Sequence, residues 1–378
     1  SGPKVKALEE EIKLFSNAKE VLCVNSWTSG AIMMLRWLGV QPEDEVIVPA
    51  YTYSATALAV LHAGAKPVMV DSGKDFNISV EAIRNVITSK TKAIIPVDIA
   101  GFPCDYECIM ELVNEPDIRG MFQPTSSVQE RLGRILVMND AAHSLGAYYS
   151  RNQRTGCETD IAIFSLHAVK NVTTAEGGAI CLKLPAPFDN PELYKELHMM
   201  SLNCQTKDAF SKSKAGGWRY DIVGLGMKIN MADVNAAIGL AQIREYPALL
   251  KERRRVFNTY SKAFADYDWA IIPPSVDGEK ESSYHIYALR IKNFTEEQRD
   301  RMIDEIAKAE VAVNVHFIPM PMLSFFKSLG YDIKNYPQAY ENFKGEISLP
   351  IYPQLDEEQL NFIINVVKAA YITVAGTE

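Results

Sequence analysis

Short apolar runs alternate with segments of helical spacing over the first 140 residues of the chain. The runs are rich in valine and isoleucine, which is typical of strands that are buried on both faces of a sheet. Strands are expected at residues 21–24, 45–50, 66–71, 92–98 and 135–140, and helices between them at 29–38, 54–64 and 80–87. This alternation predicts an α/β fold whose mostly parallel sheet is covered by helices on both faces. Ligands of such sheets bind at the carboxyl ends of the strands, so functional residues are expected just after these runs.

The pattern changes after residue 230, where longer amphipathic segments replace the short runs. The spacing predicts two successive helices at 231–243 and 249–267, strands at 284–291 and 311–319, and helices at 296–310 and 356–375. A chain of 378 residues usually divides into more than one core. We therefore expect a large domain over residues 1–245 and a smaller α+β domain over residues 246–378.

Residues 114–133 form a polar stretch without a clear period. The stretch is too long for a routine loop inside a compact domain. We expect a surface insertion with one helical turn, and the sequence leaves open whether it closes over a substrate.

The composition excludes several classes of protein. The 39 basic and 47 acidic side chains give a net charge of −8, which argues against a general nucleic-acid binder. No apolar run approaches the roughly 18 to 20 residues of a membrane span, and the first residues lack the apolar region of a signal peptide. We expect a cytoplasmic protein without a membrane partner.

The cysteines indicate neither a disulfide framework nor a metal site. There are six of them, and most lie inside apolar runs, as reduced core thiols do: Cys23, Cys104, Cys108, Cys157, Cys181 and Cys204. Only Cys104 and Cys108 are close in sequence, and no second pair or suitably spaced histidine accompanies them. No metal is expected.

A turn at residues 25–30 (NSWTSG) joins an expected strand to an apolar helix. The free amides and hydroxyls of a helix N-terminus can bind a phosphate group. Ser and Thr are equally ordinary helix caps, and on this feature alone capping is the simpler interpretation. The chain has neither a G-x-G-x-x-G nor a P-loop motif, which argues against a nicotinamide dehydrogenase and against a P-loop enzyme.

Two charged residues, Asp140 and Lys170, follow apolar strands and are expected near the edge of the sheet where ligands bind. Asp140 closes an apolar strand, where a buried carboxylate requires a cation or a protonated ring nitrogen, although a helix cap would also explain it. Lys170 lies between an apolar strand and a Glu176-Gly177-Gly178 turn. Burial would lower its pKa and make it a nucleophile for a carbonyl group, and a lysine reaching out of a loop is the alternative.

These three features together match the needs of pyridoxal 5′-phosphate (PLP). A helix start would hold its phosphate, an aspartate would keep its ring nitrogen protonated, and a lysine would bind its aldehyde.

The sequence resembles the DegT/DnrJ/StrS family of PLP-dependent sugar aminotransferases. The resemblance extends over nearly the whole chain and rests on GPKVKALEEE, PEDEVIVPAYTYSATALAVLHAGAKPVMVD, NDAAHSLGA, FSLHAVKNVTTAEGGA, GLGMKINMADVNAAIGL and EISLPIYPQL. It implies the type I aspartate aminotransferase fold, with a mostly parallel seven-stranded sheet in the large domain. It also implies that the enzyme is a transaminase with PLP as its cofactor.

The resemblance implies roles for individual residues. Lys170 matches the lysine that binds the cofactor and moves protons, and Asp140 matches the partner of the ring nitrogen. Further cofactor contacts are implied for Thr28, Ser29, Tyr53, His143, Ser165 and Asn230. The match of Asn230 is to a residue contributed by the neighbouring subunit, which implies a homodimer with shared active sites. Trp27 replaces the small residue that the family usually has, so a bulky ring lies at the phosphate turn.

The implied reaction moves an amino group from L-glutamate to a sugar ketone or aldehyde. The acceptor expected from the resemblance is a nucleotide-linked keto sugar, in the biosynthesis of surface polysaccharides such as lipopolysaccharide or of amino sugars. Two alternatives stay open: an oxidised 3-deoxy-octulosonic acid without a nucleotide, aminated to an 8-amino-3,8-dideoxy-octulosonate, and a regulatory PLP-binding protein. Candidate substrate contacts are Lys228, His285, Tyr287 and His316, for which packing or interface roles are equally consistent.

Overall fold

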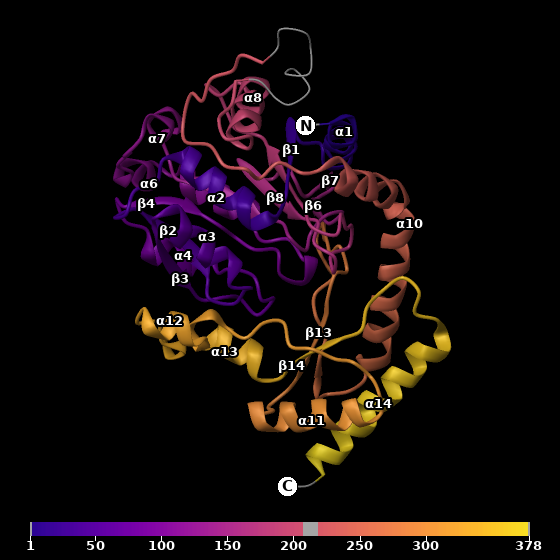
Figure 1. Ribbon diagram of the computed structural model, residues 1–378. Helices are drawn as coiled ribbons and strands as arrows, with labels where there is room; N and C mark the ends of the chain where they lie inside the picture. Colours follow the sequence, from indigo (N-terminus) through magenta and orange to yellow (C-terminus); the bar gives the residue numbers. More distant parts are fainter. Residues whose placement is uncertain (1, 207–217, 377–378) are drawn as a thin grey trace.

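A seven-stranded sheet forms the centre of the larger part of the computed structural model, which describes residues 2–206 and 218–376 (Figure 1). In spatial order its strands are β1 (Glu20–Val24), β9 (Gly178–Leu182), β8 (Ile161–Ser165), β5 (Leu136–Asp140), β4 (Thr91–Ile94), β2 (Glu45–Pro49) and β3 (Lys66–Val70). Only β9 runs against the others, because it pairs antiparallel with both β1 and β8. The expectation of a mostly parallel sheet is confirmed.

Helices cover both faces of this sheet, as the alternating pattern predicts. On one face α2 (Trp27–Leu38) lies over β1, β8 and β9, and α3 (Ala55–Ala63) lies over β2 and β3. The other face is covered near β1 by α1 (Pro3–Ser16) and the start of α10 (Asp233–Phe264), and near β3 by α4 (Val80–Val86) and α5 (Tyr106–Asn114). Helix α8 (Asn190–Met200) contacts β1 from the side of α2. The strands therefore bury both faces, which explains their continuous apolar runs.

The smaller part has its own core, drawn in orange and yellow at the bottom of Figure 1. A three-stranded sheet of β10 (Ala270–Ile271), β13 (Tyr287–Ile291) and β14 (Glu346–Leu349) packs against α11 (Glu296–Lys308) and α14 (Glu357–Ala375). The short helices α12 (Ser324–Ser328) and α13 (Pro337–Lys344) pack instead against the core of the larger part. A second small sheet joins β11 (Val276–Asp277) and β12 (Lys280–Glu281) to β6 (Tyr148–Ser150) and β7 (Gln153–Arg154).

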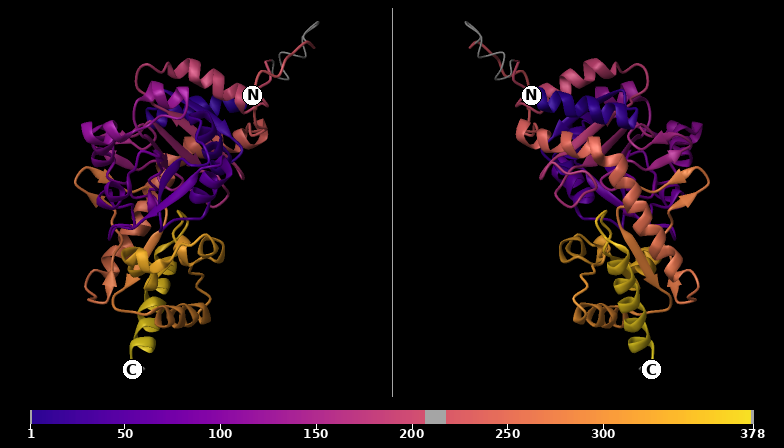
Figure 2. Two further views of the ribbon diagram at one scale, coloured as in Figure 1. Left: turned by 90° about the vertical axis from the view of Figure 1, so that its left-hand side faces the viewer. Right: turned by 90° about the vertical axis from the view of Figure 1, so that its right-hand side faces the viewer.

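The two helices expected at 231–243 and 249–267 are one continuous helix, α10, which passes from the larger part into the smaller (Figure 2, right). Pro247 lies inside it, and the helix continues through the proline because both of its halves are anchored by buried side chains. Leu240 and Ile243 belong to the core beneath the large sheet, whereas Val256 and Phe257 belong to the smaller core. A division at residue 245 would thus fall within this helix.

The strand expected at 311–319 is absent from the structure and was a wrong prediction. Its alternating pattern is met only by an isolated bridge between Asn314 and Ser348. Pro319 and Pro321 lack the N–H groups that a longer ladder requires. The segment instead crosses back to the larger part, where the amide of Met320 donates to the carbonyl of Ala50.

The stretch at 114–133 contains two helices, α6 (Pro116–Met121) and α7 (Ser127–Leu132), rather than one helical turn. The Ser126 hydroxyl donates to the carbonyl of Leu38 over 2.7 Å, which fixes this stretch at the C-terminal end of α2. Among the described residues, no helix is both long and apolar enough to cross a membrane.

Candidate active site

The carboxyl ends of the strands surround a cavity of about 400 Å³, within the size range of small-molecule sites. The larger part contributes residues that follow β1, β2, β4 and β5, the last residue of β8 and the turn before β9, and the smaller part contributes a few more. The residues that carry polar or aromatic groups are Ser26, Trp27, Thr28, Thr52, Tyr53, Thr56, Asp140, His143, Ser165, His167, Lys170, Glu176, His285, His316 and Phe317. The cavity lies at the edge of the sheet where the sequence predicts ligand binding.

The N-terminus of α2 forms one end of the cavity. The Ser26 hydroxyl caps the helix by accepting from the Ser29 amide over 3.1 Å. The amides of Trp27 and Thr28 have no acceptor among the described residues, so their partial positive charge is available to an anion. Gly178 allows this arrangement, because a Cβ there would lie 2.7 Å from the Trp27 nitrogen.

Asp140 is buried at the end of β5, where it lines the cavity. One carboxyl oxygen accepts from the Thr56 hydroxyl over 2.8 Å, and the other accepts from the Ala142 amide over 3.2 Å. Burial raises the pKa of Asp140 to about 7, while the bond from Thr56 acts in the opposite direction. A buried carboxyl with a raised pKa is stabilised as an anion when a cationic ligand lies beside it.

Lys170 lies in the turn between β8 and β9, and its amide donates to the carbonyl of His167 over 3.0 Å. Burial lowers the pKa of Lys170 to about 8, and the charge of Asp140 opposes this change. The Lys170 side chain is therefore an uncharged amine in a larger fraction of molecules near neutral pH than a lysine in water is. Such an amine is a nucleophile for carbonyl carbon.

Four histidines line the cavity: His143, His167, His285 and His316. The rings of His143 and His285 lie 4.5 Å apart, and the ring of His143 stacks on Phe317 at 5.8 Å. Burial lowers the pKa of both His143 and His285 well below its usual value, and nearby Lys170 adds to the effect. The rings are therefore neutral in the physiological range. Nδ1 of His285 donates to the side-chain oxygen of Asn171, since that amide nitrogen already donates to the Ser283 carbonyl.

Most of the residues expected from the sequence meet in this cavity, namely Thr28, Tyr53, Asp140, His143, Ser165, Lys170, His285 and His316. Four others do not line it in this chain. The hydroxyl of Ser29 accepts from Ser26 in the cap, and Lys228 bonds to Asn230 beside the end of β1. Tyr287 is fully buried among Phe257 and Tyr260 in the smaller core, so the expected substrate contact is not what the structure shows.

Several lining residues escape the sequence reasoning. Thr56, in the first turn of α3, donates its hydroxyl hydrogen bond to Asp140. The only feature of the sequence that could have indicated this role is its position shortly after a predicted strand. His167 and Glu176 form an exposed pair, 3.5 Å apart, at the rim. Phe317 covers His143 from a segment that the sequence places in a strand. Nothing in the sequence brings this last segment next to β5.

The residues present fit PLP. The helix end offers unpaired amides to a phosphate, Asp140 offers a carboxylate to a ring nitrogen, and Lys170 offers an amine to an aldehyde. The ring of His143 also carries a buried Nδ1 that has no partner within the described residues, as expected beside a space that a ligand fills.

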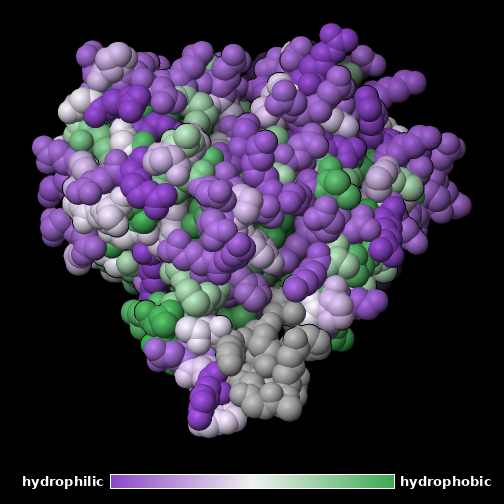
Figure 3. Space-filling model, turned by 90° about the horizontal axis from the view of Figure 1, so that it is seen from above, coloured by the Kyte–Doolittle hydropathy of each residue, from purple (hydrophilic) through white to green (hydrophobic). Residues whose placement is uncertain are grey.

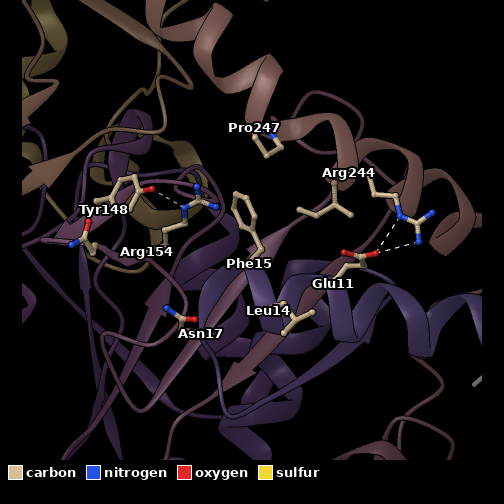
Figure 4. Close-up of a pocket in the computed structure, with 10 residues that line it drawn as sticks. Glu11, Leu14, Phe15, Asn17, Tyr148, Arg154, Arg244 and Pro247 are labelled. Atoms are coloured by element: carbon tan, nitrogen blue, oxygen red, sulfur yellow. Dashed lines mark hydrogen bonds and ion pairs between the residues drawn. The ribbon is translucent and has the colours of Figure 1, made fainter.

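A larger hollow of about 600 Å³ lies between α1, α10 and the β6–β7 hairpin (Figure 4). Arg244 is paired there with Glu11 at 3.1 Å, and Arg154 lies 3.9 Å from the centre of the Phe15 ring. No lysine, aspartate or histidine is among its lining residues, so this hollow lacks the chemistry of the cavity at the strand ends.

Comparison with known proteins identifies the family. The model of the DegT/DnrJ/EryC1/StrS aminotransferase family matches residues 1–368. The spore coat polysaccharide biosynthesis protein SpsC of Bacillus subtilis is 31% identical over 372 residues, which cover 97% of this chain and 89% of that protein. An uncharacterized protein of Methanocaldococcus jannaschii is 34% identical over 371 residues, 97% of this chain and 90% of that one.

Solved structures agree with this result. Spr1654 of Streptococcus pneumoniae, assigned as a sugar aminotransferase, matches in its PMP-form with a TM-score of 0.94 and 41% identity, over 99% of this chain and 93% of that one. Its PLP-form matches with a TM-score of 0.93 and 40% identity, over 99% and 92% of the two chains. The expected fold and enzyme class are confirmed. The chain belongs to the DegT/DnrJ/EryC1/StrS aminotransferase family.

Proposed function

We propose that the enzyme transfers the amino group of L-glutamate to a ketone or aldehyde of a sugar, with PLP as its cofactor. The observation that carries the proposal is the meeting of an amine, a carboxylate and an unpaired helix end in one cavity. Bound PLP supplies a carbonyl carbon that takes up the amino group and a ring that accepts negative charge from the neighbouring carbon.

The residues of the chain perform the remaining tasks. Trp27 and Thr28 hold the phosphate through their amides, and Asp140 keeps the proton on the ring nitrogen. Nζ of Lys170 first holds the cofactor and then, once it is released, carries protons to and from the reacting carbon. Positioning and proton transfer by groups fixed in this way are the main sources of rate. Tyr53 and Phe317, whose rings are 6.0 Å apart, border the cavity and would offer aromatic surface to a bound cofactor.

The acceptor class that we propose first is a nucleotide-linked keto sugar in polysaccharide or amino-sugar biosynthesis. The names of SpsC and Spr1654 support a sugar, without giving its structure. One observation favours the alternative of an acidic sugar without a nucleotide. Lys170 is the only lysine among the lining residues and no arginine joins it, so the described cavity offers no further cation to a diphosphate. Parallel assays with both acceptor classes separate these two candidates.

The amino donor is tested by the absorbance spectrum of the purified holoenzyme. Addition of L-glutamate should convert the band of the lysine-bound cofactor into that of its amine form, without any sugar present. D-Glutamate is the matched control, because it has the same charge and size but presents its α-hydrogen in the wrong position. A loaded enzyme whose spectrum stays unchanged with L-glutamate would exclude glutamate as donor and favour the regulatory alternative.

We also propose a homodimer in which Asn230 reaches the cavity of the partner subunit. Asn230 does not line its own cavity, yet it lies beside the end of β1 through a bridge with Val24. The segment before it exposes large apolar side chains, including Trp218 at 69% and Leu225 at 89%. Figure 3 shows hydrophobic residues gathered next to the grey segment. Exposed apolar surface of this kind is typical of a subunit interface.

Complementation tests the shared site. Asn230→Ala should weaken cofactor binding roughly 10- to 100-fold, as expected for the loss of a hydrogen bond to a charged group. Mixed dimers of Asn230→Ala with Lys170→Ala chains then contain one site with both defects and one intact site. Subunit exchange should therefore restore part of the activity. At a PLP concentration that loads the wild type but not the Asn230→Ala enzyme, a mixture that stays as inactive as its components would place Asn230 in the site of its own subunit.

A cytoplasmic location is proposed because all six cysteines are free thiols, as in a reducing compartment.

A further inference from the structure

Two buried side chains of β14 lie behind His316, which forms the wall of the cavity on the side of the smaller part. Nδ1 of His316 is 2.9 Å from the hydroxyl of Ser348, and that hydroxyl bonds in turn to Oε1 of Glu346. The backbone amide of His316 donates to Oε2 of the same carboxyl over 2.9 Å. Glu346 has no exposed surface and Ser348 is 5% exposed, so water does not compete for these bonds.

A hydroxyl has one proton to donate, so the direction of the two bonds is coupled. When Glu346 is ionised, Ser348 donates to it and must accept from Nδ1–H of His316, which leaves Nε2 as an acceptor. When Glu346 is protonated on Oε1, it donates to Ser348, and Ser348 then donates to a bare Nδ1. In that case the proton of the neutral imidazole lies on Nε2. The Nε2 atom has no partner among the described residues.

We propose that Glu346, acting through Ser348, determines the hydrogen bond between Nε2 of His316 and the acceptor sugar. Depending on the state of Glu346, Nε2 either accepts this bond from the sugar or donates it to the sugar. Glu346 and Ser348 are positioning residues, since neither lines the cavity. The inference rests on the proposed sugar aminotransferase function, because it assigns the bonding partner of His316 to the acceptor. In the donor state Nε2–H suits a carbonyl or ring oxygen of the sugar, and in the acceptor state Nε2 suits a hydroxyl.

The charges around Glu346 decide which state holds at a given pH. Burial raises the pKa of Glu346 to about 8, against the opposing charges of Arg299 on α11 and Arg290 on β13. Tyr51, which follows β2, faces the same carboxyl, and burial together with that carboxyl raises the pKa of its phenol, so it stays neutral. The donor state therefore prevails at neutral pH and the acceptor state in mildly alkaline solution.

His316 itself remains uncharged throughout this range. Burial and the nearby charge of Lys170 lower its pKa to about 4. Two of the three other histidine rings of the cavity, His143 and His285, are also kept neutral by burial, and the third, His167, lies at the exposed rim beside Glu176. Titration between about pH 6 and 10 thus moves the proton from one nitrogen of the His316 ring to the other without adding charge.

The ¹⁵N spectrum of holoenzyme labelled at histidine reports the tautomer directly. The chain has six histidines, and His316→Gln assigns the signals of His316. The wild-type ring is expected to change from the Nε2–H to the Nδ1–H form between pH 6 and 10. A single tautomer over the whole range in the wild type, which needs no substitution, would overturn the proposal.

The substitution Glu346→Gln provides a second test of the proposal. The amide of His316 should hold the Gln oxygen, so the Gln nitrogen donates to Ser348 and fixes His316 in the Nε2–H form at every pH. Glu341→Gln is the matched control, because Glu341 is exposed and its ion pair among the described residues is with Lys344. In this variant the tautomer change of His316 should follow the wild type. If His316 still changes tautomer in Glu346→Gln, the proposed relay from Glu346 through Ser348 to His316 is contradicted as well.

Kinetics connect the relay to the acceptor. Ser348→Ala should remove the alkaline limb of the pH profile of kcat/KM for the sugar and raise its KM roughly 3- to 10-fold, the effect of one hydrogen bond. Ser348→Thr keeps the hydroxyl and should restore the wild-type profile. A tautomer change in an enzyme that aminates no sugar would support the relay and refute the function. Sugar turnover by an enzyme whose His316 tautomer stays fixed would support the function and refute the relay.

Discussion

Lys170→Ala should abolish turnover and, in the same protein, the absorbance band of the lysine-bound cofactor. Lys170 provides the only lysine amine among the lining residues of the cavity, and its lowered pKa makes that amine reactive near neutral pH. Loss of proton transfer alone reduces rates by about 10²- to 10⁴-fold, and loss of the covalent attachment adds to this. Single-turnover kinetics with L-glutamate and the spectrum of the reconstituted protein measure both effects.

The control for this substitution is Lys66→Ala, which removes an exposed lysine at the start of β3. Its spectrum and rate should equal those of the wild type. If Lys170→Ala retained turnover while losing the band, another group would have to move the proton. If it retained both, Lys170 would not be the residue that holds the cofactor.

Asp140→Asn should have opposite effects on catalysis and on the stability of the apoprotein. In the holoenzyme the carboxylate faces a cationic ring nitrogen, and removing one member of a buried charge pair costs about 3–5 kcal/mol. If that loss falls on the transition state, kcat decreases roughly 10²- to 10⁴-fold. Steady-state kinetics at saturating cofactor measure this loss.

Without cofactor the same carboxyl has no ring nitrogen beside it, and burial outweighs the opposing charge of Lys170. Its pKa of about 7 lies above the ordinary value of 3.8, so the folded state binds this proton more tightly than the unfolded chain. Stability due to this group is therefore full below about pH 4 and falls as the pH rises to about 7, by up to about 4 kcal/mol. Asparagine avoids this loss, although it leaves one of the two donors, Thr56 or Ala142, without an acceptor at about 1–3 kcal/mol.

Urea unfolding of the two apoproteins tests this prediction. The free energy of unfolding should favour Asp140→Asn at pH 8, and the advantage should shrink or reverse at pH 5. Asp268→Asn, at an exposed position, should show no such dependence on pH. An Asp140→Asn apoprotein that is less stable than the wild type at both pH values would show that the carboxylate is not destabilising.

The strands of the large sheet were predictable because each is a short, mostly apolar run between turn or helix segments, buried on both faces of the sheet. The same reasoning located Asp140 and Lys170, since a charge that follows a buried strand requires a partner. It failed where the contacts are non-local. The spacing of residues 284–291 places His285 and Tyr287 on one face of a strand, but Tyr284 has a positive φ of 55° and β13 begins only at Tyr287. His285 therefore turns into the cavity while Tyr287 enters the smaller core.

The unbroken course of α10 has a mechanical consequence. A single helix of 32 residues is anchored in the core under the large sheet and in the smaller core, so the two parts are joined by a helix rather than by a loop. Side chains of the smaller part, among them Ile286 and Met320, are also built into the main core. Because these contacts flank His285 and His316, we expect both rings to hold their positions relative to Lys170 before a sugar binds. We expect acceptor selection to depend on the preformed shape and hydrogen-bonding groups of this cavity rather than on closure around the substrate.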